Sequence, residues 1–232
     1  MKTGIITYFL FLAGLLCAQD KGIATIPPSD AIMEYLAGTK EYSVLYSGKL
    51  EIPYDLRYEN HPYLETDKFV QGTLCYNNVV YQDVFMRLDL FRDELIVYFP
   101  DNINRVVLEK EKFNYAILNG YSIITSTNET KQGTTYVLQL KDGTFPVIKN
   151  YRIRNIEKNS NNGVKRSFYI QEQYFVYIND TAHLVRNKNA LLKLFPDRKK
   201  ELNEYAKLQK LNFRKQYEQS LISLVAHYET IN

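Results

Sequence analysis

The alternation of short apolar runs and turns over residues 42–186 constrains the fold most. Runs rich in Val, Ile, Tyr and Phe follow one another closely, separated by turn pairs such as Asn77-Asn78 and Asp142-Gly143. No helical segment is expected between these runs. Many short strands at close spacing predict an antiparallel β-sheet, arranged as a sandwich or an open barrel.

The expected strands can be placed individually. In the run at 84–90, alternation predicts that Arg87 and Asp89 lie on one face of the strand. The residues expected on the other face, toward the core, are Val84, Met86, Leu88 and Leu90. Two stretches, 53–67 and 158–163, are predicted to be loops. Strands are expected at residues 42–46, 48–52, 69–76, 79–90, 94–99, 105–108, 115–117, 121–125, 134–140 and 145–153, followed by a hairpin of 166–171 with 174–178 that extends to 183–185.

The aromatic composition agrees with a β-rich chain. The sequence has 20 Tyr and 12 Phe but no Trp, and Tyr and Phe favour half-buried pleated surfaces. An aromatic face that binds carbohydrate or peptide is the alternative interpretation of this enrichment.

The pattern becomes helical after Asn187. A short helix is predicted at 190–195, a second begins at Pro196-Asp197, and a third starts near residue 215. Its apolar residues recur with helical spacing at Leu221, Leu224, Val225 and Tyr228. The predicted fold class is therefore α+β, with a C-terminal appendage of two to three helices packed on the β-domain.

The N-terminus has the order of a secretory signal peptide. Met1-Lys2 is basic, residues 5–16 are apolar, and Cys17-Ala18 precede a polar stretch. Cleavage after Ala18 is expected; a lipoprotein anchored through Cys17 is the alternative. No second apolar stretch is long enough to span a bilayer. The predicted division is a signal peptide at 1–18, a lead-in with a short helix at 19–40, a β-domain at 41–186 and a helical tail at 187–232.

Few residues suggest catalysis, and no metal or cofactor is predicted. Cys75 is the one cysteine left after cleavage and is expected to be a buried packing residue. His61, His183 and His227 are too far apart in the sequence for a zinc-ligand pattern.

Four carboxylates gather around one predicted hairpin, at Asp83, Asp89, Asp93 and Glu94. A pair of carboxylates can hydrolyse glycosidic bonds. The simpler interpretation is that Asp93 caps the turn while Asp83 and Asp89 face solvent and pair with Arg87 and Arg92.

The helical tail is basic. Residues 186–215 hold ten Lys or Arg and three acidic residues, a local charge of +7 in a chain of +3 overall. This segregation predicts either a solvated helix face or contact with an anionic surface. The candidates for such a contact are Arg198, Lys199, Lys200, Lys207, Lys210, Arg214 and Lys215. Separately, Asp180-Thr181-Ala182 resembles a short O-glycosylation sequon, with Thr181 as the acceptor.

Two segments resemble a family of uncharacterised exported proteins of Gram-negative bacteria. One is Gly72 to Val97, with a glycine-led strand, a Tyr-x-x-Val strand and an Asp-x-x-x-Asp-x-Leu turn; the other is Leu191 to Asn203 with the late Tyr228-Glu229 pair. The resemblance implies a β-domain with a helical tail and export from the cytoplasm. It implies no activity and no site residues.

These observations predict an exported, non-enzymatic interaction or accessory protein of the periplasm or outer membrane. Its partner would be another protein or a membrane surface in the cell envelope, and the small net charge argues against nucleic acid. The alternative is a binding module for a lipid, glycan or peptide that uses an aromatic sheet face.

Overall fold

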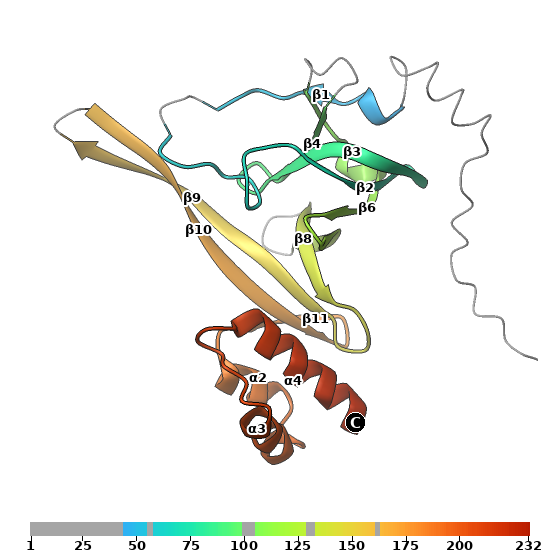
Figure 1. Cartoon of the computed structure of the whole chain (residues 1–232), viewed down its shortest axis with the longest axis vertical. Helices are drawn as coiled ribbons and strands as arrows, with labels where there is room; N and C mark the ends of the chain where they lie inside the picture. The colour runs from blue at the N-terminus through green and yellow to red at the C-terminus, as the bar shows by residue number, and fades with distance from the viewer. Residues whose placement is uncertain (1–43, 55–57, 99–104, 129–132, 161–162) are drawn as a thin grey trace, which may run out of the picture. The chain divides into compact units, whose positions relative to one another are not determined.

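The computed structural model describes residues 44–54, 58–98, 105–128, 133–160 and 163–232. The predicted signal peptide, its cleavage site and the lead-in helix lie outside these residues. Within them, the protein is an α+β fold with one antiparallel sheet followed by three C-terminal helices, as the sequence predicts (Figure 1).

The sheet has 11 strands among the described residues, in the order β1-β5-β4-β3-β2-β6-β7-β8-β9-β10-β11. Its first and last strands do not pair with each other, so the sheet is open. The strands are β1 (Lys49–Leu50), β2 (Val70–Tyr76), β3 (Val79–Asp89), β4 (Glu94–Tyr98), β5 (Arg105–Val107), β6 (Phe113–Leu118), β7 (Tyr121–Asn128), β8 (Gly133–Lys141), β9 (Val147–Ser160), β10 (Gly163–Ile178) and β11 (Thr181–Val185).

Two-residue turns with left-handed backbone conformation set the register of two hairpins. Asn77 and Asn78 join β2 to β3 with φ of 51° and 62°, and Asn179 and Asp180 join β10 to β11 with φ of 48° and 61°. Two positive φ values match the type I′ turn, whose twist suits a two-residue hairpin, and Asn and Asp tolerate this conformation. The prediction of a hairpin at Asn77-Asn78 is confirmed.

The main core lies on one face of β2–β8. It includes Val84, Met86 and Leu88 of β3, which are at most 8% exposed, together with Leu95 and Val97 of β4. The predicted inward face of β3 is confirmed for these three positions. Cys75 is also buried, as expected. Burial of each large aliphatic side chain contributes about 1.5–3 kcal/mol to stability.

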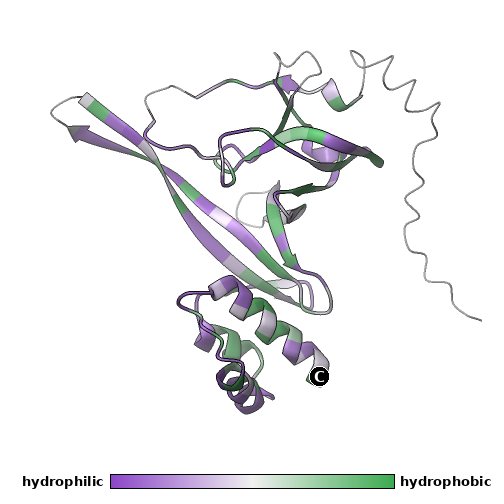
Figure 2. Cartoon of the chain, in the orientation of Figure 1, coloured by the Kyte–Doolittle hydropathy of each residue, from purple (hydrophilic) through white to green (hydrophobic). Residues whose placement is uncertain are grey.

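The helices α2 (Lys188–Leu194), α3 (Lys199–Leu208) and α4 (Tyr217–Ile231) enclose a second core with the ends of β9–β11. Val147, Val176 and Val185 come from the strands, and the expected stripe from Leu221 to Tyr228 comes from α4. Figure 2 shows hydrophobic and hydrophilic residues in turn along α4. A side-chain amide caps α2, because Asn187 accepts a hydrogen bond from the Ala190 N–H at 2.9 Å.

Three local predictions are wrong. Residues 44–46 form a 3-10 turn, η2 (Val44–Tyr46), and not a strand. The loop expected at 158–163 is mostly strand, because β9 continues to Ser160 and β10 begins at Gly163. The hairpin expected between 166–171 and 174–178 does not exist, since both segments belong to β10. A second 3-10 turn, η3 (Lys110–Lys112), precedes β6.

Candidate functional site

The polar face of β3–β5 is the face that points away from the main core. Cross-strand pairs place Arg87 opposite Ile96 and Asp89 opposite Glu94, and Tyr98 opposite Arg105. Near the end of β3, beyond the last residue that pairs with β2, Tyr63 forms an isolated β-bridge with Asp89. Side chains from four segments distant in sequence therefore meet on this face.

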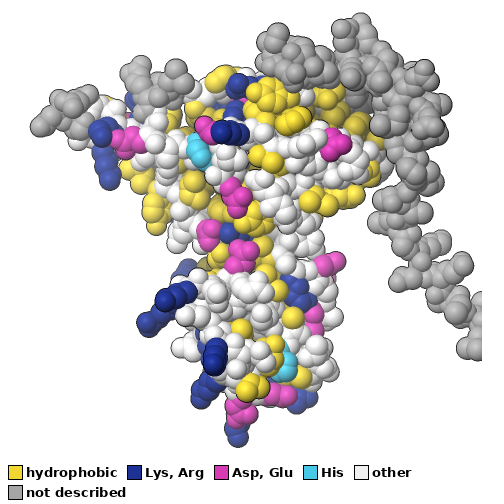
Figure 3. All heavy atoms as spheres, viewed as in Figure 1, with side chains coloured by type: hydrophobic (Ala, Val, Ile, Leu, Met, Phe, Trp, Pro, Cys, Tyr) yellow, Lys and Arg dark blue, Asp and Glu magenta, His cyan; other side chains and the backbone are white. Residues whose placement is uncertain are grey.

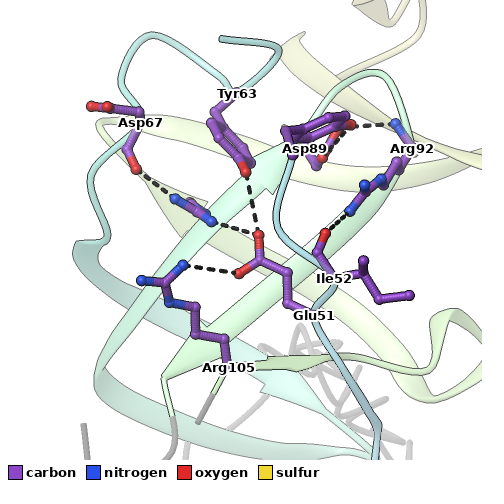
Figure 4. Close-up of polar contacts among 9 residues, drawn as sticks. Glu51, Ile52, Tyr63, Asp67, Asp89, Arg92 and Arg105 are labelled. Carbon is purple, nitrogen blue, oxygen red and sulfur yellow. Dashed lines mark hydrogen bonds and ion pairs between the residues drawn. The ribbon is translucent and has the colours of Figure 1, made fainter. Parts of the chain in front are cut away.

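Glu51 is the centre of the contacts on this face (Figure 4). Its Oε1 accepts hydrogen bonds from Arg87 Nη2 and from the Tyr63 hydroxyl, the latter at 3.2 Å, and its Oε2 lies 3.6 Å from Arg105 Nη1. The Glu51 side chain is fully buried and that of Arg87 is 9% exposed. A buried carboxylate is tolerated because two guanidinium groups and a hydroxyl replace its water.

Aromatic rings and a carbonyl fix the Arg87 guanidinium. Its carbon lies 3.9 Å from the centre of the Tyr63 ring and 4.4 Å from that of Phe69, and Nη1 donates to the Asp67 carbonyl at 2.7 Å. Burial raises the pKa of Tyr63 to about 12, so its hydroxyl remains a donor to Glu51 at neutral pH. The Arg87 Nε is buried and has no hydrogen-bond partner among the described residues.

Asp89 organises the β3–β4 turn beside this network. Its Oδ1 accepts from the N–H groups of Phe91 and Arg92 at 2.9 Å each, and its Oδ2 accepts from the Tyr54 hydroxyl at 2.8 Å. Arg92 lies over the Tyr54 ring at 4.0 Å and donates to the Ile52 carbonyl. Asp89 is fully buried, and burial raises the pKa of its carboxyl.

The carboxylate predictions therefore need correction. Asp89 and Arg87 do not face solvent, because a second layer of tyrosines covers this side of the sheet. Asp89, and not Asp93, caps the turn. Asp93 instead pairs with Lys110 and accepts from the Tyr136 N–H at 2.9 Å, whereas Asp83 is exposed as expected. Neither of the two cavities described below is lined by Asp83, Asp89 or Asp93.

An open cavity of about 550 Å³ lies at the edge of this network, and we call it the arginine cavity. Two guanidinium groups line it. Arg87 belongs to its buried wall, whereas the Arg105 side chain is 38% exposed. Within the described part of the chain Arg105 has one ion pair, the long one with Glu51, and its guanidinium carbon lies 5.7–5.8 Å from the ring centres of Phe69 and Tyr98. The lining consists of Asp67, Lys68, Phe69, Phe85, Arg87, Tyr98 and Arg105.

A second cavity, of about 420 Å³, is lined in part by Tyr63, Tyr151, Lys149 and Glu172. Lys149 Nζ lies 2.8 Å from Glu172 and 3.1 Å from Glu218 on α4. Burial opposes its charge, but the hydrogen bond to Glu172 and nearby negative groups raise the pKa of Lys149 above its usual value. Its charge is already neutralised by protein groups, so this cavity offers less to an ionic ligand than the arginine cavity does.

The sequence-predicted contact residues lie elsewhere. The seven basic residues proposed for an anionic surface are all exposed, in α3 and in the segments on either side of it, and Thr181 is exposed at the start of β11. None lines the arginine cavity. His61 lines the second cavity, while His227 stacks on Tyr205 with ring centres 3.7 Å apart. The described residues contain no group of three His, Cys, Asp or Glu that could hold a metal ion.

The sequence reasoning missed Glu51, Arg105 and Phe69. A charged residue at every second position of a strand, as at Arg87 and Asp89, is the signal that could have indicated a covered polar face. Comparison of the chain with protein-family models, curated proteins and solved structures gives no match. None of the helices in the described residues is long and apolar enough to cross a membrane.

Proposed function

We propose that this chain is an exported, non-enzymatic binding protein of the cell envelope, and that the arginine cavity takes a small ligand with an anionic group and an apolar body. The export part rests on the signal-like residues 1–18. The binding part rests on one observation. Arg105 is a partly exposed guanidinium at a cavity wall, and its carboxylate partner is shared with a second arginine.

The charges favour an anionic ligand. The Glu51 side chain is fully buried and does not line the cavity, whereas Arg105 and Lys68 do. Guanidinium presents five N–H donors in a fork that matches a carboxylate or phosphate. Among the described residues Arg105 has one carboxylate contact, at 3.6 Å from Glu51, which leaves donors of its guanidinium group for a ligand. Asp67 at the rim reduces the net positive charge but does not reverse it.

The rings and the size favour an apolar body beside the anionic group. Phe69, Phe85 and Tyr98 line the cavity, and Phe85 is 49% exposed on the strand face beside Arg87. A volume of about 550 Å³ lies in the range of small-molecule pockets. An aromatic or aliphatic acid would place its carboxylate at Arg105 and its apolar part against these rings.

A matched pair of probes tests this function. Naphthalene-2-carboxylate and naphthalene-2-carboxamide have the same shape and differ in charge. Calorimetric titration of both therefore isolates the contribution of the negative charge to the free energy of binding. We expect the carboxylate to bind the wild-type protein and the amide to bind much more weakly. Arg105→Gln should weaken carboxylate binding about tenfold or more, since it removes a charged hydrogen bond of about 1.5–3 kcal/mol.

The control variant is Arg214→Gln, which removes an exposed arginine that does not line the cavity. It should bind as the wild type does. Equal affinity for the acid and the amide, or equal loss in both variants, would contradict the proposal.

A further inference from the structure

Strands β9 and β10 extend beyond the rest of the sheet as a two-stranded ribbon (Figure 1). β9 pairs with β10 over the whole length of β9, from Val147–Val176 to Ser160–Gly163. In contrast, β8 pairs with β9 only as far as Lys149, and β11 pairs with β10 only from Tyr174 onwards. Residues 150–160 of β9 therefore have no second neighbouring strand among the described residues.

The two faces of this ribbon differ in charge. Side chains of paired residues share a face, so Glu157, Glu172 and Phe168 lie on one side, where the Tyr58 ring stacks on the Phe168 ring. The opposite side has no acidic residue of either strand. We call it the basic face; it comprises Arg152, Arg154, Ile156, Lys158, Lys165, Ser167, Tyr169 and Gln171.

The cations of the basic face are exposed and largely without protein partners. Arg152, Arg154 and Lys158 are exposed and form no ion pair with any described residue. Lys165 is exposed and pairs with Glu59 at 2.8 Å. Basic side chains project from the ribbon in Figure 3. Because alternate residues of a strand are about 7 Å apart, the three cations of β9 form a row along one surface.

Apolar groups lie between these cations. Tyr169 is 45% exposed and pairs with Arg154, whose guanidinium lies 5.4 Å from the centre of its ring. Ile156 lies between Arg154 and Lys158 on the same face and is partly exposed. The basic face thus combines a row of positive charge with an amphipathic ring and an aliphatic side chain.

We propose that the basic face docks on an anionic phospholipid surface. Opposite charge supplies the attraction, because the row of cations carries no compensating carboxylate from its own strands. The apolar groups decide between anionic partners. A lipid interface accepts tyrosine rings and aliphatic side chains beside its head groups, whereas a hydrated acidic polymer gains nothing from them.

The basic helical tail is the competing location, and its charges are less segregated. Glu201 and Glu204 lie on α3 among Lys199, Lys200 and Lys207. Arg198 lies 3.6 Å from Glu201 and 4.0 Å from Asp197. Attraction to a surface is weaker where acids alternate with bases, so we place the docking surface on the ribbon.

Two matched triple variants test this proposal. One replaces Arg152, Arg154 and Lys158 with Gln, and the other replaces Lys199, Lys200 and Lys207 with Gln. Binding of the full chain to phosphatidylcholine vesicles, with and without phosphatidylglycerol, is measured by co-sedimentation at low and high salt. Circular dichroism melts of both variants check folding, which should be unchanged since exposed cations add little stability.

We expect the wild type to bind vesicles that contain phosphatidylglycerol, and to release them at high salt. The ribbon variant should bind about a hundredfold more weakly, because each basic residue near an anionic membrane contributes about fivefold. The helix variant should bind nearly as the wild type does.

Three results would overturn the proposal. The first is that the wild type binds vesicles equally well with and without phosphatidylglycerol. The second is that the ribbon variant binds them as the wild type does. The third is that the wild type binds heparin beads but no vesicle. The ligand test at Arg105 is independent of all three, because the basic face shares no residue with the arginine cavity.

Discussion

Asp89 shows how a charged residue can be essential to a fold while resembling a surface residue in the sequence. It alternates with Leu88, so the sequence places it on the opposite face of the strand and predicts that this face meets solvent. The structure covers the face with Tyr54 and Tyr63, so Asp89 is fully buried and its three acceptor contacts replace water. Alternation predicts which face a residue occupies but not whether another layer lies above it.

A pair of variants at adjacent positions tests this arrangement. Leu88→Asp should lower the free energy of unfolding by several kcal/mol, because it buries an unpaired charge in the main core. Asp89→Asn should also be destabilising at neutral pH, by about 1–3 kcal/mol, since it disturbs the contacts to the Tyr54 hydroxyl and the turn amides. Thermal melts of both variants beside Asp83→Asn, an exposed carboxylate, provide the comparison.

The pH dependence of Asp89→Asn has a defined sign. The folded-state pKa of Asp89 is raised above its unfolded value, so its protonation favours folding. That contribution is full below about pH 4, the ordinary aspartate pKa, and is lost as the pH rises through the folded value. The free energy of unfolding of the wild type should therefore rise relative to that of the variant as the pH falls toward about 4. A constant difference between the two proteins over that range would show that Asp89 is not buried in this way.

At the scale of elements, most strands and all three C-terminal helices were predictable from period and turn signals. The single strand β10 was not predictable, because the polar pair Glu172-Gln173 is typical of a turn between two strands. Glu172 is exposed and forms an ion pair with Lys149 of β9, so polar residues occur within this strand without ending it. The arginine cavity was not predictable either, since Glu51, Arg87 and Arg105 meet only through the pairing of β1, β5, β4 and β3.

A substitution at Gly72 tests the close approach of β2 and β6. A Cβ atom at this position would lie 2.3 Å from the Ile117 carbonyl oxygen, which belongs to the backbone and cannot move without disturbing the sheet. Gly72→Ala should lower stability by about 1–3 kcal/mol, the usual effect of overpacking. Urea unfolding measures the change, with Gln71→Ala at the neighbouring exposed position as control. Equal midpoints for the two variants would contradict the pairing that places Ile117 there.

At the scale of the whole described chain, strands of one sheet contribute to two hydrophobic cores. The main core packs on β2–β8, and the helices pack on the ends of β9–β11, where Glu229 of α4 pairs with Lys141 and accepts from the Phe145 N–H at 2.8 Å. The helices do not line the arginine cavity. A ligand at Arg105 is therefore expected to affect the β3–β5 face without disturbing the helical core.

Nuclear magnetic resonance of the Arg105 side chain tests the central claim of ligand binding most directly. The Nε–H resonance of Arg105 is followed while naphthalene-2-carboxylate is added, with the amide probe as control. We expect a saturable shift of the Arg105 resonance and of the neighbouring Phe69 and Tyr98 signals with the acid, little change with the amide, and undisturbed signals from Leu224 of α4. An unchanged Arg105 resonance at saturating acid, or equal shifts with both probes, would contradict it.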